Sequence, residues 1–111
     1  MAKYSFVVLS NPTPGNEAEY NRWYNEQHLP DVLAVPGFVA AQRFRRDDPD
    51  SQLKYSYMAI YEIESDDVAK TMADLNGRAG TPAMQLSDAI DLAGVSTTLF
   101  SPVTGRVLPS K

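Results

Sequence analysis

A short stretch near the N-terminus holds side chains that could bind a polar ligand and move one proton. His28, the only histidine of the chain, follows Tyr24 by four residues and Tyr20 by eight. In a helix, residues at these intervals are neighbours on one face, so two phenols and an imidazole would form one wall. The imidazole titrates near neutral pH without help from its surroundings. His28 is therefore the first candidate for a catalytic acid or base, with Tyr24 beside it.

The same residues also permit a purely structural interpretation. At a helix end, His28 could hydrogen-bond a backbone carbonyl and stabilise the turn into Pro30. Trp23 could anchor the hydrophobic core rather than contact a substrate. The choice between a packed core stripe and the wall of a pocket stays open at this point.

Residues 17–28 must form the helix that positions this wall. Asn16 can cap it, and two glutamates lie in its first turn, where the helix dipole favours negative charge. At 100° per residue, the aromatic residues and their polar neighbours share an arc of roughly 140°, namely Tyr20, Trp23, Tyr24, Gln27 and His28. Because Pro30 disfavours helical geometry at the residue before it, we expect the regular helix to end near His28. Asp31 could then cap a short extra turn through Leu33 and Ala34.

The remaining elements follow from alternating apolar residues and from turn signals. β-branched and aromatic runs predict strands over residues 3–9, 38–45, 55–63 and 94–100. A second helix begins at residues 65–67, and a further helical piece follows over 81–90. Residues 101–111 form a tail or an arm onto a partner. The chain of 111 residues makes a single domain, 1–111.

Three further site candidates lie on the predicted strands. Tyr57 and Tyr61 share one face of strand 55–63, so their hydroxyls could point toward His28 if that face meets the helices. Gln42 is a polar residue on the face of strand 38–45 that also carries Phe38 and Phe44. An amide in such a place either forms its hydrogen bonds within the protein interior or contacts a ligand in a pocket. Together with Tyr20 and Trp23, these three residues are candidates for substrate binding.

The order of elements predicts an α+β fold of the βαββαβ type. With right-handed crossovers, this order gives a four-stranded antiparallel sheet with both helices on one face. The second and third strands carry apolar residues on both faces, so the uncovered face needs a second layer. We expect this layer to be a second copy of the chain, which makes a homodimer joined through the open sheet faces.

Composition excludes several kinds of partner and chemistry. The net charge of −4 and the absence of a basic stripe argue against nucleic acid. Without cysteine there are no disulfides and no thiolate chemistry, and the aspartates at 47, 48 and 50 are typical of a solvated turn rather than a metal site. No apolar run is long enough to span a membrane, and the N-terminus resembles a first strand, which favours a cytoplasmic protein. We expect no metal and no cofactor. A haem with His28 as its axial ligand is an alternative that only this single histidine supports.

The most specific signal is the run YNRWYNEQHLPD at residues 20–31, followed by VPGF at 35–38 and AAQRF at 40–44. This pattern resembles the EthD-like branch of the dimeric α/β-barrel superfamily. The resemblance implies a ferredoxin-like protomer, a dimer whose two sheets form a barrel, and a cavity between the sheet and the helices of each protomer. It also implies that His28 is the acid or base, with Tyr20, Tyr24 and Trp23 near the cavity. The superfamily includes isomerases, cyclases, lyases, cofactor-free monooxygenases and haem proteins.

Two functional hypotheses follow. In the first, the chain is a small cofactor-independent enzyme of the isomerase, cyclase or lyase type. A small cyclic or aromatic metabolite would enter a hydrophobic cavity, and His28 would transfer a proton while tyrosine hydroxyls hold an oxyanion. In the second, the same homodimer binds a small molecule without chemistry or acts as an accessory protein. A cofactor-free monooxygenase is a further alternative.

Overall fold

Four strands with alternating inward and outward residues form one antiparallel sheet in the computed structural model, which describes residues 1–110. The strands are β1 (Ala2–Ser10), β2 (Phe38–Arg45), β3 (Tyr57–Ser65) and β4 (Ser96–Phe100), arranged in the order β2-β3-β1-β4. The two central strands pair along their whole length, from Ala2 opposite Ser65 to Ser10 opposite Tyr57. This order confirms the predicted α+β, ferredoxin-like arrangement.

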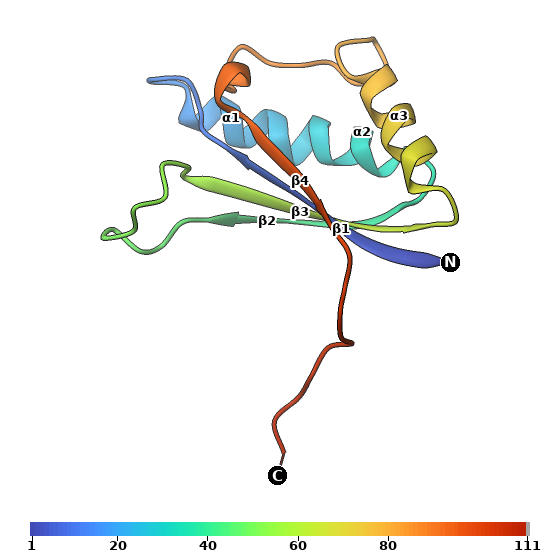
Figure 1. Cartoon of the computed structure of the whole chain (residues 1–111). Helices are drawn as coiled ribbons and strands as arrows, with labels where there is room; N and C mark the ends of the chain where they lie inside the picture. Colours follow the sequence, from blue (N-terminus) through green and yellow to red (C-terminus); the bar gives the residue numbers. More distant parts are fainter. Residues whose placement is uncertain (111) are drawn as a thin grey trace.

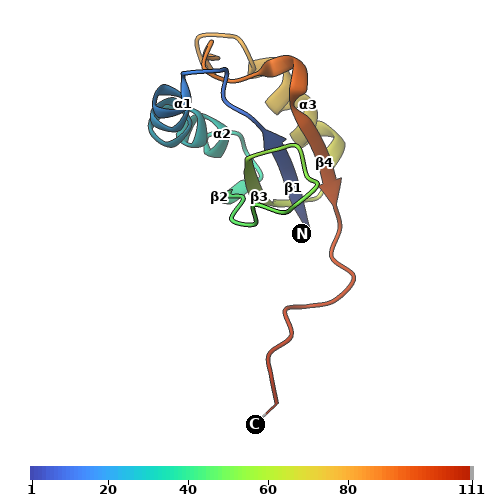
Figure 2. The same cartoon turned by 90° about the vertical axis from the view of Figure 1, so that its left-hand side faces the viewer.

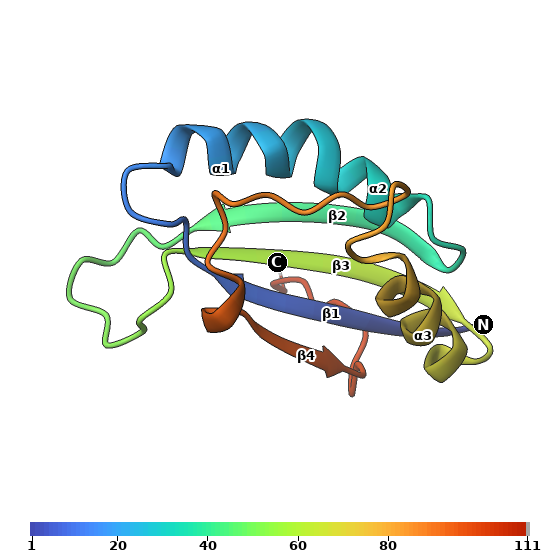
Figure 3. The same cartoon turned by 90° about the horizontal axis from the view of Figure 1, so that it is seen from above.

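The helices cover one face of this sheet, as predicted (Figure 1). The first helical run consists of α1 (Glu17–Trp23), the π-helical turn η1 (Tyr24–His28) and α2 (Leu29–Leu33); α3 (Val68–Arg78) and the 3₁₀ turn η2 (Leu92–Gly94) follow later. Seen from above, the first run and α3 lie over different parts of the sheet, and the segment after α3 crosses between them (Figure 3). The core lies between the helices and the sheet and includes the buried side chains of Phe6, Val8, Ala59, Tyr61 and Ile63.

The first helical run does not stop at His28, and this corrects the expectation from Pro30. The backbone widens into a π turn in which the Leu29 N–H donates to the Tyr24 carbonyl, five residues back. Pro30 then lies in the first turn of α2, where a missing N–H removes no bond that the helix needs. The chain therefore continues as a helix to Leu33, and His28 is the last residue of the π turn.

A β-bulge in β2 changes which residues of that strand face the helices. Phe38 lies opposite Ile63 but Ala40 lies opposite Glu62, so Val39 is an extra residue without a partner. Beyond the bulge, Ala41 and Arg43 share the helix face with Phe38. Strict alternation from Phe38, which was the basis of the predicted faces, fails because the bulge shifts the period by one residue.

The predicted helical piece over residues 81–90 is wrong. These residues form turns, and their backbone pairs with the loop after β1: the Thr13 N–H donates to the Ala89 carbonyl at 2.7 Å, and the Asp91 N–H donates to the Asn11 carbonyl at 2.9 Å. If this segment were a helix, these backbone groups would form hydrogen bonds within the helix and could not pair with the loop after β1. The third strand is displaced from the predicted 55–63 to Tyr57–Ser65, and the last strand begins at Ser96 rather than at 94.

The second sheet face carries no helix or other strand of the described chain, and the C-terminal residues run on this side of the sheet. Residues 101–110 leave the end of β4 as an exposed tail on the side opposite the helices (Figures 1 and 2), and the start of this tail lines a pocket with Ser5, Val39 and Glu62. Val103 and Val107 in this tail are 98% and 81% exposed. Within the part of the chain that the structure describes, no helix has the length and apolar character that crossing a bilayer requires.

Candidate functional site

A cavity of about 150 Å³ lies between the helix layer and the sheet. The first helical run supplies one wall, and β1, β3 and the start of β4 supply the floor. The C-terminal part of α3 and the segment between α3 and β4 supply the remaining sides. The wall residues are mostly aromatic and aliphatic: Phe6, Val8, Trp23, Tyr24, His28, Val32, Tyr61, Leu75, Asn76, Ala79, Met84, Leu86, Ile90, Leu92, Val95 and Thr97. Of the predicted site residues, the structure thus brings together His28, Tyr24, Trp23 and Tyr61.

His28 reaches this cavity from the end of the π turn. Its ring lies against Trp23, with centroids 4.7 Å apart, and meets the Tyr24 ring edge-on at 5.1 Å. Its Nδ1 atom is buried and has no hydrogen-bond partner among residues 1–110. Burial lowers the pKa of His28 from 6.5 to about 4, and the positive charge of Arg43 acts in the same direction. The imidazole is therefore neutral at neutral pH.

Tyr61 brings a second unpaired polar group to the same cavity. It lies near the middle of β3, its side chain is only 1% exposed, and no partner in the described residues lies within hydrogen-bond distance of its hydroxyl, the Tyr24 hydroxyl being a more distant neighbour. Burial raises the pKa of Tyr61 far above its usual value, and nearby Tyr24 adds to the effect. The Tyr61 hydroxyl thus stays protonated and can donate a hydrogen bond. Buried polar groups are nearly always paired, so two unpaired groups beside one cavity indicate a place for a bound water or a ligand.

Tyr24 forms the wall between the cavity and the outer edge of β2. Its ring is almost fully buried, and burial raises the pKa of its hydroxyl. On this ring rests the guanidinium of Arg43, 4.2 Å from the ring centre. Arg43 also donates to Asn25 Oδ1 at 2.7 Å and to Asn21 Oδ1 at 2.9 Å. Arg43 therefore fixes the helical run to β2 and holds Tyr24 in place.

Sequence reasoning missed Arg43. In the sequence, Arg43 belongs to a basic cluster with Arg45 and Arg46 that is followed directly by aspartates, and such a cluster is usually a solvated strand end. Arg43 alone points back over the aromatic rings, since the bulge at Val39 turns it toward the helices. The spacing of Asn21 and Asn25, four residues apart on one helix face, is the signal that could have indicated a partner with a forked donor.

Trp23 lines the cavity and also bonds to the segment after α3, which forms another side of the cavity. The indole Nε1 donates to the Gln85 carbonyl at 3.1 Å. This bond joins the first helical run to the segment after α3. Trp23 therefore has the packing role that the sequence allowed, and it also presents its ring to the cavity.

Tyr20 of α1 and Tyr57 of β3 lie between the helix layer and the sheet but do not line the cavity. The Tyr20 hydroxyl is 2.6 Å from Ser10 Oγ. The Tyr57 hydroxyl donates to Glu17 and accepts from Asn21. Because both hydroxyls are engaged within the protein, these residues are better placed to stabilise the core than to bind a substrate.

The structure places Gln42 away from the cavity, which corrects the expectation that it shares a pocket with His28. Gln42 lies opposite Ile60, on the open face of the sheet, and it is exposed. The cause is again the bulge at Val39, which puts Gln42 on the face opposite to Phe38.

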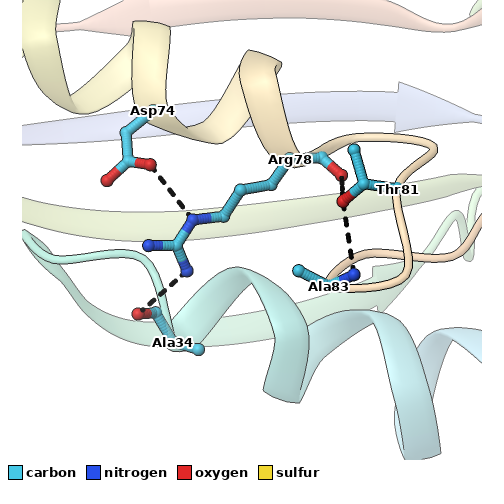
Figure 4. Close-up of polar contacts among 5 residues, drawn as sticks. All are labelled: Ala34, Asp74, Arg78, Thr81 and Ala83. Atoms are coloured by element: carbon cyan, nitrogen blue, oxygen red, sulfur yellow. Dashed lines mark hydrogen bonds and ion pairs between the residues drawn. The ribbon is translucent and has the colours of Figure 1, made fainter.

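Arg78 closes one corner of the site by joining α3 to α2. Its Nε atom pairs with Asp74 at 3.0 Å, and its Nη1 donates to the Ala34 carbonyl at 3.4 Å (Figure 4). The Arg78 carbonyl in turn accepts from the Thr81 hydroxyl at 2.6 Å. The turn after α3 is therefore held beside the helix that bears Val32, and Ala79 and Met84 reach the cavity from this turn.

Comparison with solved structures supports the ferredoxin-like, dimeric α/β-barrel type of fold. No protein-family model matches the chain, and no curated protein does. An EthD family protein from Bacillus halodurans is similar in structure, with a TM-score of 0.51 and 13% identity over 93% of this chain and 100% of that chain. The resemblance seen in the sequence therefore extends to the fold.

Two other matches come from proteins with a stated activity. A heme-degrading protein from Mycobacterium tuberculosis, solved with two hemes in its active site, has a TM-score of 0.63 and 18% identity over 94% of this chain and 99% of that chain. A monooxygenase from Streptomyces coelicolor, solved with the ligand nanaomycin D, has a TM-score of 0.60 and 15% identity over 98% of this chain and 93% of that chain. At these identities the likeness is one of fold.

A haem does not fit the cavity of this chain. An engineered cavity of about 150 Å³ holds one benzene, whereas drug-sized ligands occupy roughly 300 to 1,000 Å³. The cavity between the helix layer and the sheet, called the helix-face cavity below, has a volume of about 150 Å³ and so matches the benzene-sized cavity. A porphyrin, with four linked pyrrole rings, would require the helix layer to move away from the sheet.

Proposed function

We propose that this protein is a small enzyme that transfers a proton within the helix-face cavity, without a cofactor, on a small cyclic or aromatic metabolite. The observation that carries the proposal is the pair of buried, unpaired polar groups, His28 Nδ1 and the Tyr61 hydroxyl, on residues that line one mainly apolar cavity. One is a neutral imidazole and the other a protonated phenol. Such a pair can accept a proton and donate a hydrogen bond at the same time.

The chemistry that this pair supports is proton abstraction next to a carbonyl group. His28 takes a proton from the carbon beside the carbonyl, and the electron pair of the broken C–H bond moves toward the carbonyl oxygen. That oxygen then accepts a stronger hydrogen bond from Tyr61 as negative charge develops on it. The imidazolium returns the proton to another carbon in an isomerase, or to a leaving group in a lyase.

The low pKa of His28 makes Tyr61 an essential partner in this reaction. An imidazole with a pKa of about 4 is free to accept a proton throughout the neutral range, but it is a weaker base than an ordinary histidine. The substrate proton must therefore become more acidic, and a hydrogen bond from Tyr61 to the carbonyl oxygen would have this effect. Tyr24, beside both groups, would help to exclude water.

The test uses cyclohex-3-enone, a one-ring ketone whose isomerisation to the conjugated cyclohex-2-enone is followed by ultraviolet absorbance. The protein should accelerate this conversion. His28→Gln should lower the rate at least about 100-fold, the lower bound for a general base. Tyr57→Phe serves as a matched control, because this hydroxyl is bound within the core, and it should leave the rate unchanged. Equal rates for the wild type and His28→Gln would overturn the proposal.

A cofactor-free monooxygenase is the second candidate, and the fold likeness to the Streptomyces coelicolor monooxygenase favours it. Removal of a proton by His28 would again be the first step, with molecular oxygen then reacting at the electron-rich carbon. An oxygen electrode separates the two candidates. Oxygen uptake that depends on both substrate and His28 supports the monooxygenase, and turnover without uptake supports the isomerase or lyase. Saturable binding with neither would identify the third possibility, a non-catalytic binding protein.

We further propose that the working form is a homodimer joined through the open face of the sheet. On the sheet face opposite the helices, β1, β2 and β3 present a second apolar surface that contains Val7, Leu9, Phe44, Met58 and Ile60. Phe44 is 39% exposed in the single chain. Burying such a surface against a copy of itself is the simplest way to remove it from water.

A further inference from the structure

In the described part of the chain, the cavity wall has no permanently charged side chain, and its one imidazole, that of His28, is neutral at neutral pH. Within residues 1–110, its wall includes no Asp, Glu, Lys or Arg side chain. The nearest guanidinium, that of Arg43, lies on the Tyr24 ring and already donates to Asn21 and Asn25. A carboxylate or phosphate entering the cavity would lose its hydration without gaining a counter-charge. The wall therefore selects against ionised molecules.

The two unpaired polar groups define what an uncharged ligand must offer. Tyr61 lines the cavity, and its buried hydroxyl is a donor that needs an acceptor oxygen. His28 approaches from the helical side with its ring held between Trp23 and Tyr24, so its position is fixed before a ligand enters. A purely apolar ligand would leave both groups unpaired, and a ligand with one acceptor oxygen would satisfy the Tyr61 hydroxyl.

The volume limits the ligand to about one ring. Cavities of about 150 Å³ hold a molecule of the size of benzene. The aromatic walls formed by Trp23, Tyr24 and Phe6 suit a flat molecule. The exposed side chains of Leu86 and Leu92 also line the cavity, so they mark an apolar approach on its outer side.

From these constraints we infer that the ligand is an uncharged, single-ring molecule with a ketone or aldehyde oxygen that accepts a hydrogen bond from Tyr61. The inference rests on the proposed function, because it concerns the same cavity, and it adds the charge, the size and the recognised group. A charged aromatic acid or a fused polycyclic molecule does not meet these constraints.

The chain offers two reporters for the test. His28 and Trp23 are each the only residue of their kind, so the imidazole and indole protons give single, unambiguous NMR signals from the cavity wall. The probes are acetophenone, benzoate, toluene and 9-acetylanthracene. Acetophenone should shift both signals with a saturable dependence on concentration. Benzoate and 9-acetylanthracene should leave them unchanged at equal concentration, and toluene should bind more weakly than acetophenone.

Variants at two tyrosines of β3 make the test specific. Tyr61→Phe should weaken acetophenone binding about three- to tenfold, the usual effect of losing one neutral hydrogen bond, without weakening toluene binding. Tyr57→Phe should change neither. Benzoate binding as tightly as acetophenone, or acetophenone binding unchanged in Tyr61→Phe, would overturn the inference.

The two proposals fail in distinguishable ways. If acetophenone binds as described but isomerisation of cyclohex-3-enone does not depend on His28, the ligand class stands and the proposed proton transfer falls. If isomerisation depends on His28 but benzoate competes with the ketone, the proton transfer stands and the ligand class falls.

Discussion

The imidazole of His28 lies almost parallel to the indole of Trp23, with ring centroids 4.7 Å apart and ring planes inclined by 23°. The indole covers one face of the imidazole, and Tyr24 meets the same imidazole edge-on. Water is thus kept from most of the ring, which is the main reason for its lowered pKa. Trp23 therefore contributes both to packing and to the site, because its indole covers one face of the imidazole and adds to its burial.

The first prediction concerns stability in acid. Below pH 6.5 the unfolded chain binds a proton at His28, whereas the folded chain does not do so until about pH 4. The free energy of unfolding should therefore fall as the pH decreases through this window, by at most about 3 kcal/mol from this residue. Urea unfolding of the wild type and of His28→Gln at pH 7 and pH 4 measures the difference. A difference that does not change with pH contradicts the lowered pKa.

The second prediction separates a ligand group from a structural one. Tyr61→Phe removes a buried hydroxyl without a partner, so the free energy of unfolding should stay the same or rise by about 1 kcal/mol. Tyr57→Phe loses its bonds to Glu17 and Asn21 and should be less stable by about 1 kcal/mol. Denaturant unfolding of both variants provides the comparison. A large loss of stability in Tyr61→Phe would mean that its hydroxyl has a structural partner.

The third prediction concerns Arg43. Arg43→Met should lose the stacking on Tyr24 and the two bonds to asparagine side chains, with a cost of about 2 kcal/mol. The pKa of His28 should rise above 4 but stay below 6.5, because burial is the larger cause of its shift. NMR titration of the single imidazole measures it. Arg45→Met, an exposed neighbour on the same strand, is the control and should change neither quantity.

The fourth prediction concerns the open face of the sheet. Phe44→Asp places a charge on the proposed dimer interface, and sedimentation equilibrium should show the protein shifting from dimer to monomer. Leu33→Asp provides a matched control, since Leu33 is similarly exposed, at 40%, but belongs to α2 on the helix side. A wild type that is already monomeric, or equal effects of the two substitutions, would exclude this interface.

The fold was predictable because its main signals are repeated many times along the chain. Alternation in β1 and β3 and the aromatic face of the first helix each involve several residues, so one exception does not change the result. The same signals correctly put Tyr24 and His28 on the side of the helix that meets the sheet. Four of the seven predicted site residues line one cavity as a consequence.

The site was less predictable because two local irregularities decide it. One extra residue at Val39 moves Gln42 to the open face and Arg43 over the rings, and alternation cannot indicate such a bulge. One wide turn before Pro30 lets the helix continue, although a proline usually predicts its end. The segment 81–90 has helical composition, but its backbone bonds to a loop distant in sequence, which local patterns do not reveal.

The π turn has a consequence for how the chain tolerates changes in length. It behaves as one residue added to an otherwise continuous α-helix between Glu17 and Leu33. Deletion of the exposed Glu26 should convert the wide turn into an ordinary α-helical turn, because the extra residue is accommodated within that turn. The residues on either side would stay nearly in place, so Val32 and Val35 would remain in the core that they now fill. Elsewhere in the helix the loss of one residue would turn every later residue by about 100°, so this turn is the place where the helix tolerates a change in length.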